Sequence, residues 1–261
     1  MSAIMQRASA APSLASDLAA ALDPVVFACR AGVQPDPWQA DVLRSGANRM
    51  LLNCSRQSGK STTTALLGLH TATYMPNSLV LILSPSLRQS AEFFRTLARL
   101  HAATGATIPA KAESALRLEL ENGSRVISLP ASESTIRGYA GVRLLLIDEA
   151  SRVEDDLYSS VRPMLATTNG RLVALSTPYG KRGWWSDAWH APAQSWKRVE
   201  VPAPHCPRIS AAFLEEEREG MGDWWFRQEY LCEFVDAESA AFRTEDIERA
   251  QIHEGVETWA I

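Results

Sequence analysis

The sequence contains no apolar run that approaches the roughly 20 residues needed to cross a lipid bilayer. It also has little cysteine: four scattered residues, without the paired spacing of a metal site. Its first 22 residues are rich in Ala and Ser, but Asp17 interrupts this stretch and Asp23-Pro24 ends it, unlike in a signal peptide. We therefore expect a cytosolic protein with reduced thiols, no membrane partner, and an N-terminal arm followed by a short helix.

Neither sign of charge dominates the composition. The chain has 26 Lys and Arg residues against 30 Asp and Glu residues, for a formal net charge of −4. This balance does not indicate nucleic-acid binding, but an acidic protein can still carry a locally basic groove. With 261 residues, 46% of them hydrophobic, the chain is long enough to bury the core of one α/β domain with appendages.

Strand-like and helix-like segments alternate along the chain. Strands are predicted at residues 50–54, 79–84, 116–120, 125–129, 144–148 and 172–176. Helices are predicted at residues 61–74, 87–103, 155–167, 211–219 and 224–231. This alternation predicts an α/β fold with a mostly parallel central sheet flanked by helices, and a hairpin turn at 121–124. The Trp-, Pro- and Gly-rich segment 178–207 gives no clear assignment.

The loop between the first predicted strand and the next helix is the most informative stretch. It reads Ser55-Arg56-Gln57-Ser58-Gly59-Lys60-Ser61-Thr62. A phosphate-binding loop has this context, because its backbone N–H groups and the following helix N-terminus attract an anion. Lys60 would then reach the β- and γ-phosphates, and the Ser61 hydroxyl would ligate Mg²⁺. Cys54 replaces the usual first glycine, and an ordinary strand-to-helix turn with a solvated lysine is the alternative.

Two carboxylates follow the continuously apolar run at residues 144–147. Asp148 and Glu149 would lie at the carboxyl end of a buried strand, where ligands bind in open parallel sheets. Asp148 would hold Mg²⁺, and Glu149 would orient and deprotonate an attacking water. An acidic strand end without function is the alternative, but the pairing with Lys60 favours a nucleotide hydrolase.

Two further motifs lie before the phosphate loop and after the acidic strand end in the sequence. Ser176, Thr177 and Pro178 end the strand at 172–176, where hydroxyls beside the γ-phosphate could sense hydrolysis; a plain strand-to-turn transition is the alternative. Gln39 has a carboxamide that can read both edges of adenine, and Trp38 offers a stacking face. A proline-started helix with a packed tryptophan explains these two residues equally well.

Two arginines could stabilise charge on a transferred phosphoryl group. Arg137 precedes the acidic strand on a glycine-flanked loop, and Arg56 lies inside the phosphate loop. Arg137 could equally be solvated or face DNA. The tryptophan pairs at 184–185 and 224–225 are more typical of core or interface anchors than of a stacking surface for bases.

Together these motifs resemble the ATPase portion of the phage terminase large subunit, the motor that drives DNA into a viral capsid. The resemblance covers residues 24 to 242. It rests on P-W-Q at 37–39, S-R-Q-S-G-K-S at 55–61, T-I-R-G at 135–138, L-L-L-I-D-E-A at 144–150, S-T-P at 176–178 and the segment 226–234. It implies a P-loop ATPase domain at 24–234, between an N-terminal arm and helix at 1–23 and a linker or tail at 235–261.

The resemblance also implies cofactors, partners and roles. ATP and Mg²⁺ would be the cofactors, Ser176–Pro178 the coupling motif, and Arg137 an arginine that could act across a subunit boundary. Double-stranded DNA, the portal protein and the terminase small subunit would be the partners of a homo-oligomeric ring in the bacterial cytoplasm. Only residues 241–247 resemble the entry to the family's nuclease domain, so we expect ATP hydrolysis without DNA cleavage. A helicase-like ATPase and a nucleotide-binding remnant are the alternatives.

Overall fold

A computed structural model describes residues 13–131, 136, 138–192 and 196–236. Its centre is an eight-stranded sheet with strand order β3-β4-β5-β2-β6-β7-β1-β8. The strands are β1 (Arg49–Cys54), β2 (Leu79–Ser84), β3 (Ala110–Ser114), β4 (Arg117–Leu120), β5 (Arg125–Pro130), β6 (Val142–Asp148), β7 (Arg171–Ser176) and β8 (Lys197–Val201). The run from β5 to β8 is parallel, and β3 and β4 add an antiparallel margin.

The predicted α/β fold with a mostly parallel sheet is confirmed. All six predicted strands are present, and β4 and β5 form the predicted hairpin. Strands β3 and β8 were not predicted. Every residue of β3 is exposed, and β8 is mostly polar, so neither carries the apolar pattern of a strand that enters a core.

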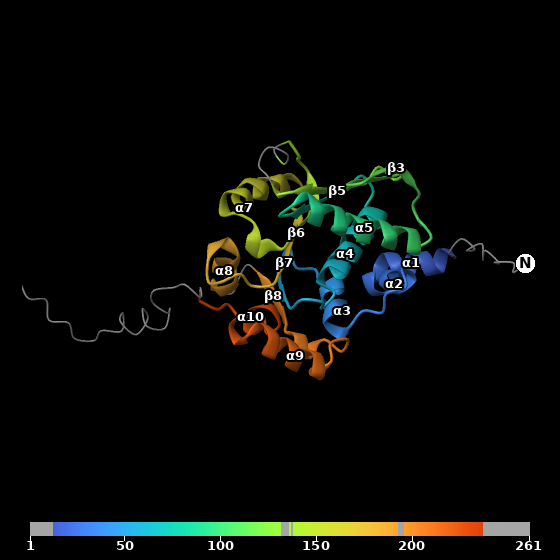
Figure 1. The fold of residues 1–261 in the computed structure, drawn as a ribbon. Coiled ribbons are helices and arrows are strands. Elements are labelled where there is room, and N and C mark those ends of the chain that lie inside the picture. The colour runs from blue at the N-terminus through green and yellow to red at the C-terminus, as the bar shows by residue number, and fades with distance from the viewer. Residues whose placement is uncertain (1–12, 132–135, 137, 193–195, 237–261) are drawn as a thin grey trace, which may run out of the picture.

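Helices cover both faces of the sheet (Figure 1). One face packs against α1 (Leu14–Leu22), α2 (Pro24–Arg30), α3 (Pro37–Arg44), α4 (Lys60–Tyr74) and α5 (Leu87–Ala103). The other packs against α7 (Asp155–Val161) and α8 (Gly183–His190). Strand side chains alternate between these cores, as Leu51 and Leu52 show, because successive residues of a strand point to opposite faces.

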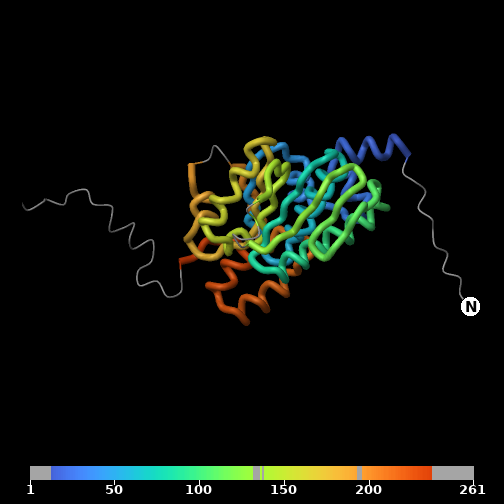
Figure 2. The backbone as a smooth tube through the Cα atoms, turned by 90° about the horizontal axis from the view of Figure 1, so that it is seen from above, coloured from blue at the N-terminus to red at the C-terminus, as the bar shows by residue number. Residues whose placement is uncertain are grey.

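Helices α9 (Ala211–Met221) and α10 (Asp223–Glu229) form a separate small core beside the β8 end of the sheet. Figure 2 shows this red and orange pair lying along one side of the sheet. The backbone N–H of Ala203, just after β8, donates to the carbonyl of Tyr230 at 2.7 Å. This contact joins the last helix to the last parallel strand.

The helix predicted at 155–167 is only partly correct. It is α-helical as α7 and continues as a 3-10 helix, Arg162–Thr168. Pro163 explains the change, since proline removes a backbone donor and clashes with the preceding helical turn. Helices α2 and α8 were not predicted, and α3 was recognised only as the alternative reading of Trp38 and Gln39; each has only seven or eight residues, which gives little helical period.

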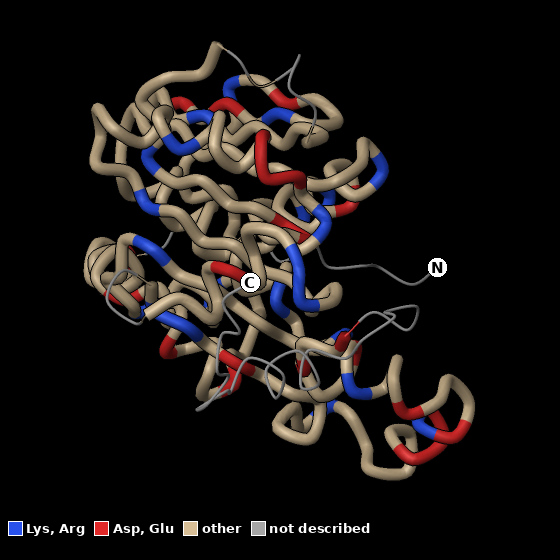
Figure 3. Tube along the Cα trace, turned by 90° about the vertical axis from the view of Figure 1, so that its left-hand side faces the viewer, with Lys and Arg blue, Asp and Glu red and all other residues tan. Residues whose placement is uncertain are grey.

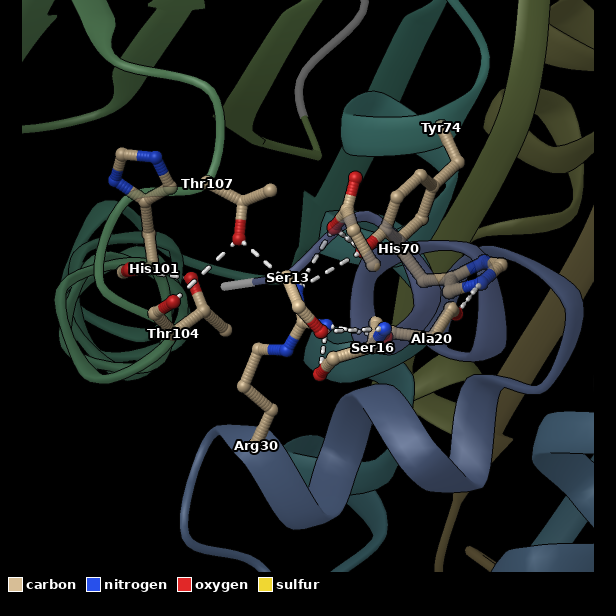
Figure 4. A network of polar contacts seen from close by, with 10 residues as sticks. Ser13, Ser16, Ala20, Arg30, His70, Tyr74, His101, Thr104 and Thr107 are labelled. Carbon is tan, nitrogen blue, oxygen red and sulfur yellow. Dashed lines mark hydrogen bonds and ion pairs between the residues drawn. The ribbon is translucent and has the colours of Figure 1, made fainter. Parts of the chain in front are cut away.

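Arg30 fixes the N-terminal helices to the rest of the fold (Figure 4). Its guanidinium donates to the Asp17 carboxylate at 2.8 Å and to the Ser16 carbonyl at 2.6 Å. It also reaches the Tyr74 hydroxyl at 3.4 Å and the Thr107 hydroxyl at 3.5 Å. One side chain on α2 therefore ties α1 to the end of α4 and to the chain after α5.

The cysteines and the helices bear on two expectations from the sequence, reduced thiols and no membrane partner. All four cysteines are free thiols, and three of them are buried. In the part of the chain that the structure describes, no helix combines the length and apolar character required to cross a membrane. The predicted arm at residues 1–12 and the tail beyond residue 236 lie outside the described residues.

Candidate active site

The predicted phosphate loop connects β1 to α4 at the carboxyl edge of the sheet. Two of its residues adopt left-handed backbone conformations: Gln57 with φ of 60° and Gly59 with φ of 90°. The buried Ser58 hydroxyl donates to the Ser55 carbonyl at 2.9 Å, which closes the turn. No side chain caps the start of α4 at Gly59, so the first N–H groups of the helix are left for an anion. Thr62 lies in the first turn of α4 and is half-buried.

Lys60 and Glu149 meet across the loop. The Lys60 ammonium lies 3.8 Å from a Glu149 carboxylate oxygen, and Lys60 is only 8% exposed. Glu149 adopts a left-handed conformation with φ of 48°, directly after β6. A non-glycine residue held in this region stores strain that is common at functional sites. The turn brings the carboxylate back over the sheet edge toward Lys60.

A pocket of about 590 Å³ opens above this pair. Its lining residues are Arg56, Gln57, Lys60, Gln89, Glu149, Arg152 and Thr177. Most of these side chains are polar or charged, as a site for a phosphate-bearing ligand requires. Gln89 and Arg152 were not predicted; Arg152 lies with its guanidinium 4.2 Å from the centre of the Tyr179 ring, a contact that no sequence spacing indicates.

Asp148 lies beneath Glu149 and is 7% exposed. Burial, followed by the charge of Glu149, raises the pKa of the Asp148 carboxyl to about 7, while Lys60 and a hydrogen bond from Ser61 oppose the shift. One carboxyl oxygen, Oδ1, is buried and has no hydrogen-bond partner among the described residues. A cation at this position would supply the missing interaction.

The residues fit Mg²⁺ bound together with a nucleotide. Asp148 and Ser61 line a common pocket of about 280 Å³ and provide a carboxylate and a hydroxyl. Mg²⁺ commonly binds one or two carboxylates, substrate phosphates and water rather than a cage made only of protein groups. Consistently, the described residues contain no cluster of three or more His, Cys, Asp or Glu side chains that could hold a metal alone.

The predicted coupling motif borders the same pocket. The Thr177 side chain lines it, and Pro178 is buried. The Ser176 hydroxyl lies 2.7 Å from the Ser151 hydroxyl and accepts from the Ser151 backbone N–H at 3.2 Å. The end of β7 is therefore bonded to the segment that follows Glu149.

Arg56 points from the phosphate loop toward the last helix. Its guanidinium donates to the Glu229 carboxylate at 2.6 Å, and its backbone N–H donates to the Glu229 carbonyl at 3.1 Å. The Glu229 side chain is only 6% exposed, so it holds Arg56 from the protein interior. Sequence reasoning missed Glu229, because an acidic residue inside an apolar helix has no local signature of its partner.

Gln39 and Trp38 lie at the start of α3 next to the loop. The Gln39 carboxamide oxygen accepts from the Asp36 backbone N–H at 2.8 Å and completes a capping box. Its nitrogen approaches Gly59, where an added Cβ would lie 2.8 Å from it. Trp38 packs against the main core. Both residues are thus part of the proline-started helix, the alternative recognised from the sequence.

Arg208 is a further residue that the sequence did not reveal. Its guanidinium pairs with the Asp36 carboxylate at 2.8 Å and donates to the Ser58 carbonyl at 2.9 Å. It therefore binds the phosphate loop from the segment after β8. Arg137, the second predicted arginine, lies outside the described residues; its neighbour Ile136 is buried.

Comparison with known proteins gives the family. The model for the N-terminal part of the terminase large subunit, T4likevirus type, matches residues 51–249. The chain belongs to this family. No curated protein sequence matches it.

Solved terminase structures share the fold. The large terminase ATPase domain of Thermus phage P74-26 aligns with a TM-score of 0.70 and 22% identity over 80% of this chain and 97% of that domain. The large terminase of bacteriophage HK97 aligns with a TM-score of 0.64 and 18% identity over 77% of this chain and 51% of that one. A large terminase from a thermophilic bacteriophage in complex with ATP-gamma-S gives 0.62 and 12%, over 76% of this chain and 52% of that one. This chain thus spans about half of those two longer terminases.

Proposed function

We propose that this terminase chain is an ATP-hydrolysing motor subunit that translocates double-stranded DNA into a phage capsid. The observation that carries the proposal is the arrangement at the ends of β1 and β6. There an uncapped helix start, a buried lysine and two adjacent carboxylates surround one polar pocket. Residues 24–234 would form the ATPase domain.

In this proposal each group of the site has one role. Backbone N–H groups from Gln57 to Thr62 and the Lys60 ammonium bind the phosphates, while the N–H groups of Ser55 and Arg56 donate to the carbonyls of Val201 and Glu229. The Glu149 carboxylate accepts a proton from the attacking water, and its 3.8 Å approach to Lys60 keeps it over the γ-phosphate position. Arg56 reaches the same pocket and can stabilise transferred charge when it leaves Glu229.

Ser61 and Asp148 would hold Mg²⁺. The ion, when bound, neutralises charge on the β- and γ-phosphate oxygens. The pocket has the size and polarity for a triphosphate, and a relative with the same fold was crystallised with ATP-gamma-S. Gln39, with Trp38 beside it, lies close enough to Gly59 to contact a nucleotide base if its capping bond opens.

Hydrolysis would be passed on through Ser176, Thr177 and Pro178. Thr177 borders the pocket, and Ser176 is bonded to the segment after Glu149, so loss of the γ-phosphate would alter both contacts together. The portal protein and the terminase small subunit would be the partners of a homo-oligomeric ring in the bacterial cytoplasm. Arg137 would complete a neighbouring subunit's site in that ring.

Glu149→Gln tests the proposed hydrolysis. We expect ATP turnover to fall by at least 10²-fold, since general-base assistance contributes about 10²–10⁴-fold. Binding of a fluorescent ADP analogue should persist, because the phosphate loop is unchanged. Glu215→Gln on α9 removes an equal charge far from the pocket and is the matched control. Undiminished turnover of Glu149→Gln would remove Glu149 from the role.

Turnover should also depend on assembly if an arginine is supplied by a neighbour. We expect the ATPase rate per subunit to rise with protein concentration, and further when duplex DNA and portal are added. A rate that stays at background under all these conditions would instead indicate a nucleotide-binding remnant. Strand separation of a duplex would indicate the helicase-like alternative.

A further inference from the structure

Basic residues begin the parallel strands on the edge of the sheet opposite the phosphate loop. Arg49 is the first residue of β1, Arg171 of β7 and Lys197 of β8, and Arg143 is the second residue of β6. Strands β6, β7, β1 and β8 are neighbours in the sheet. In Figure 3, basic segments follow one another down the left side of the view.

The strand register places the backbone positions of these residues at nearly one level, with Arg143 and Arg49 on the α7 face of the sheet and Arg171 and Lys197 on the other face. Arg171 lies opposite Leu144, one residue after Arg143. Lys197 lies opposite Met50, one residue after Arg49. Because neighbouring strands are about 4.8 Å apart, the four positions form a row roughly 15 Å long across the edge. We call Arg143, Arg171, Arg49 and Lys197 the basic row.

Part of the basic row lines a pocket of about 310 Å³. Arg143 and Arg171 border it together with Asn48, Thr168 and Asn169, and its lining contains no carboxylate. Two guanidinium groups and several neutral polar groups around one hollow are suited to an anion.

The positive charges of the row have no acidic partners. Among the described residues, none of the four forms an ion pair with Asp or Glu. The three arginines donate instead to backbone carbonyls: Arg49 to Gly170 at 2.8 Å, Arg171 to Ser45 at 2.9 Å and Arg143 to Thr168 at 3.3 Å. Carbonyl contacts orient the guanidinium groups but leave their charge available to an anion.

Arg162 adds another cation beside the row. Its guanidinium lies 5.6 Å from the centre of the Tyr158 ring, and Arg162 and Arg49 both lower the pKa of the Tyr158 hydroxyl against the effect of burial. Arg162 therefore contacts this ring, and Arg49 lies near enough for its charge to act on the same hydroxyl. Arg162 is exposed and also lacks an acidic partner among the described residues.

We infer that the basic row and Arg162 form a binding surface for the phosphate backbone of double-stranded DNA. A single small anion would need only the pocket between Arg143 and Arg171, whereas the row continues across four strands. Duplex DNA presents a negative charge about every 1.7 Å along its axis, so a row of cations contacts several phosphates at once. The inference rests on the proposed motor function and assigns it a DNA-facing surface.

This placement would give the motor a direct mechanical connection. Strand β7 begins at Arg171 in the basic row and ends at Ser176 beside the nucleotide pocket, about 17 Å away along the strand. Nucleotide and DNA would then bind at opposite ends of the same strands. A change at the coupling motif would reach the DNA surface through one rigid element.

The test compares a double variant, Arg143→Gln with Arg162→Gln, with the unchanged 261-residue chain. Binding of a fluorescent duplex is measured by anisotropy over a range of NaCl concentrations. Loss of two phosphate contacts should lower the slope of log affinity against log salt by about 2 and weaken binding roughly tenfold at low salt. Arg171 is left intact, because its carbonyl contacts hold the fold.

Two further variants separate charge at this edge from other causes. Arg95→Gln with Arg218→Gln removes the same net charge from exposed positions on α5 and α9 and should leave the salt slope unchanged. Arg143→Lys with Arg162→Lys keeps the charge and should recover most of the affinity. The melting temperature and binding of the ADP analogue should be equal in all of these proteins.

The inference is overturned if the edge variant binds duplex DNA with the affinity and salt slope of the control pair, or if the unchanged chain does not bind duplex DNA. In either case, continued binding and hydrolysis of ATP would leave the proposed ATPase activity standing. Conversely, full DNA binding by a chain that does not hydrolyse ATP would refute the proposed function, while the inferred DNA-binding surface would still stand.

Discussion

The carboxyl and amino edges of the parallel sheet handle charge in different ways. At the carboxyl edge, charges of both signs lie close together. The Lys60 ammonium is 3.8 Å from the Glu149 carboxylate, and the adjacent Asp148 is buried. At the amino edge, Arg143 and Arg171 share a pocket without a carboxylate and bond to backbone carbonyls. Opposed, buried charges suit a chemical step, whereas an exposed cation such as Arg143 without an acidic partner among the described residues suits a polyanion; Arg171 beside it is half-buried, which lowers its pKa.

The backbone differs between the two edges as well. Gln57 and Glu149 adopt left-handed conformations at the carboxyl edge, although neither is glycine or asparagine. At the amino edge Asn169 is left-handed, a conformation that asparagine accepts readily. At the carboxyl edge the left-handed conformation directs the Glu149 carboxylate toward Lys60; Ala106, after α5, shows that a left-handed residue other than glycine or asparagine also occurs away from this site.

Asp148→Asn, at the carboxyl edge, should give the largest change in the free energy of unfolding among the variants considered. The folded pKa of Asp148, about 7, lies above its ordinary value of 3.8, so the folded state binds the proton more tightly. The wild-type free energy of unfolding should therefore fall as pH rises from about 4 to 7. The asparagine variant lacks this loss and should be more stable at pH 8 by up to about 3 kcal/mol, without nucleotide or Mg²⁺.

Urea unfolding at pH 5 and pH 8 measures this effect. Asp156→Asn, which neutralises an exposed acid on α7, is the matched control and should follow the wild type at both values. A stability difference between Asp148→Asn and wild type that is independent of pH would show that Asp148 is ionised throughout.

Glycine substitutions compare the rigidity of the two edges. At Gly170, before β7, an added Cβ would lie 2.2 Å from the Val142 carbonyl oxygen, and a backbone atom on a neighbouring strand cannot move aside cheaply. Gly170→Ala should cost about 2–3 kcal/mol of unfolding free energy. Gly59→Ala meets only the movable ends of the Gln39 and Arg208 side chains, and we expect a cost of about 1 kcal/mol from its positive φ.

Thermal unfolding and nucleotide titration distinguish the two glycine variants. Gly170→Ala should lower the melting temperature and keep nucleotide affinity in the folded fraction. Gly59→Ala should do the reverse, with a small thermal effect and weakened nucleotide binding. Equal thermal losses would mean that the edges do not differ in rigidity.

The Arg56–Glu229 pair should give the smallest but most asymmetric effect. Arg56→Gln leaves a buried carboxylate without its cation and should cost about 1–2 kcal/mol; the side chain of Arg56 is 59% exposed, which limits the loss. Glu229→Gln leaves a solvated guanidinium and should cost about 0.5 kcal/mol. Urea unfolding of both variants and of the double variant measures the asymmetry. Equal losses would indicate that the pair is solvent-screened throughout.

Much of the fold was predictable because its parts are local. Alternating apolar segments predicted the parallel strands, and α5 begins and ends where its sequence period does. The short helices α2 and α8 were missed, and α3 was recognised only as an alternative, because seven or eight residues contain few turns from which to establish a period. The polar strand β8 joins the sheet through backbone pairing with β1, which leaves little trace in side-chain type.

In the candidate site as well, the residues that belong to local motifs were predicted and their partners from distant segments were not. Lys60, Ser61, Asp148 and Glu149 were predicted from two short motifs, and the structure brings them together. Their neighbours Arg152, Arg208 and Glu229 were not predicted. Glu229 lies 173 residues from its partner Arg56, and no spacing rule operates over such a distance.

The sequence by itself determined the strand–loop–helix around Lys60 and the acidic end of β6, because each depends on residues that are adjacent in the chain. Only the tertiary structure decided which charges are paired and which are free. Arg56 pairs with the Glu229 carboxylate because α10 packs against the phosphate loop. The basic row forms because four strands align in register. Charge acts through distance in space, and that distance is fixed only when separate segments pack together.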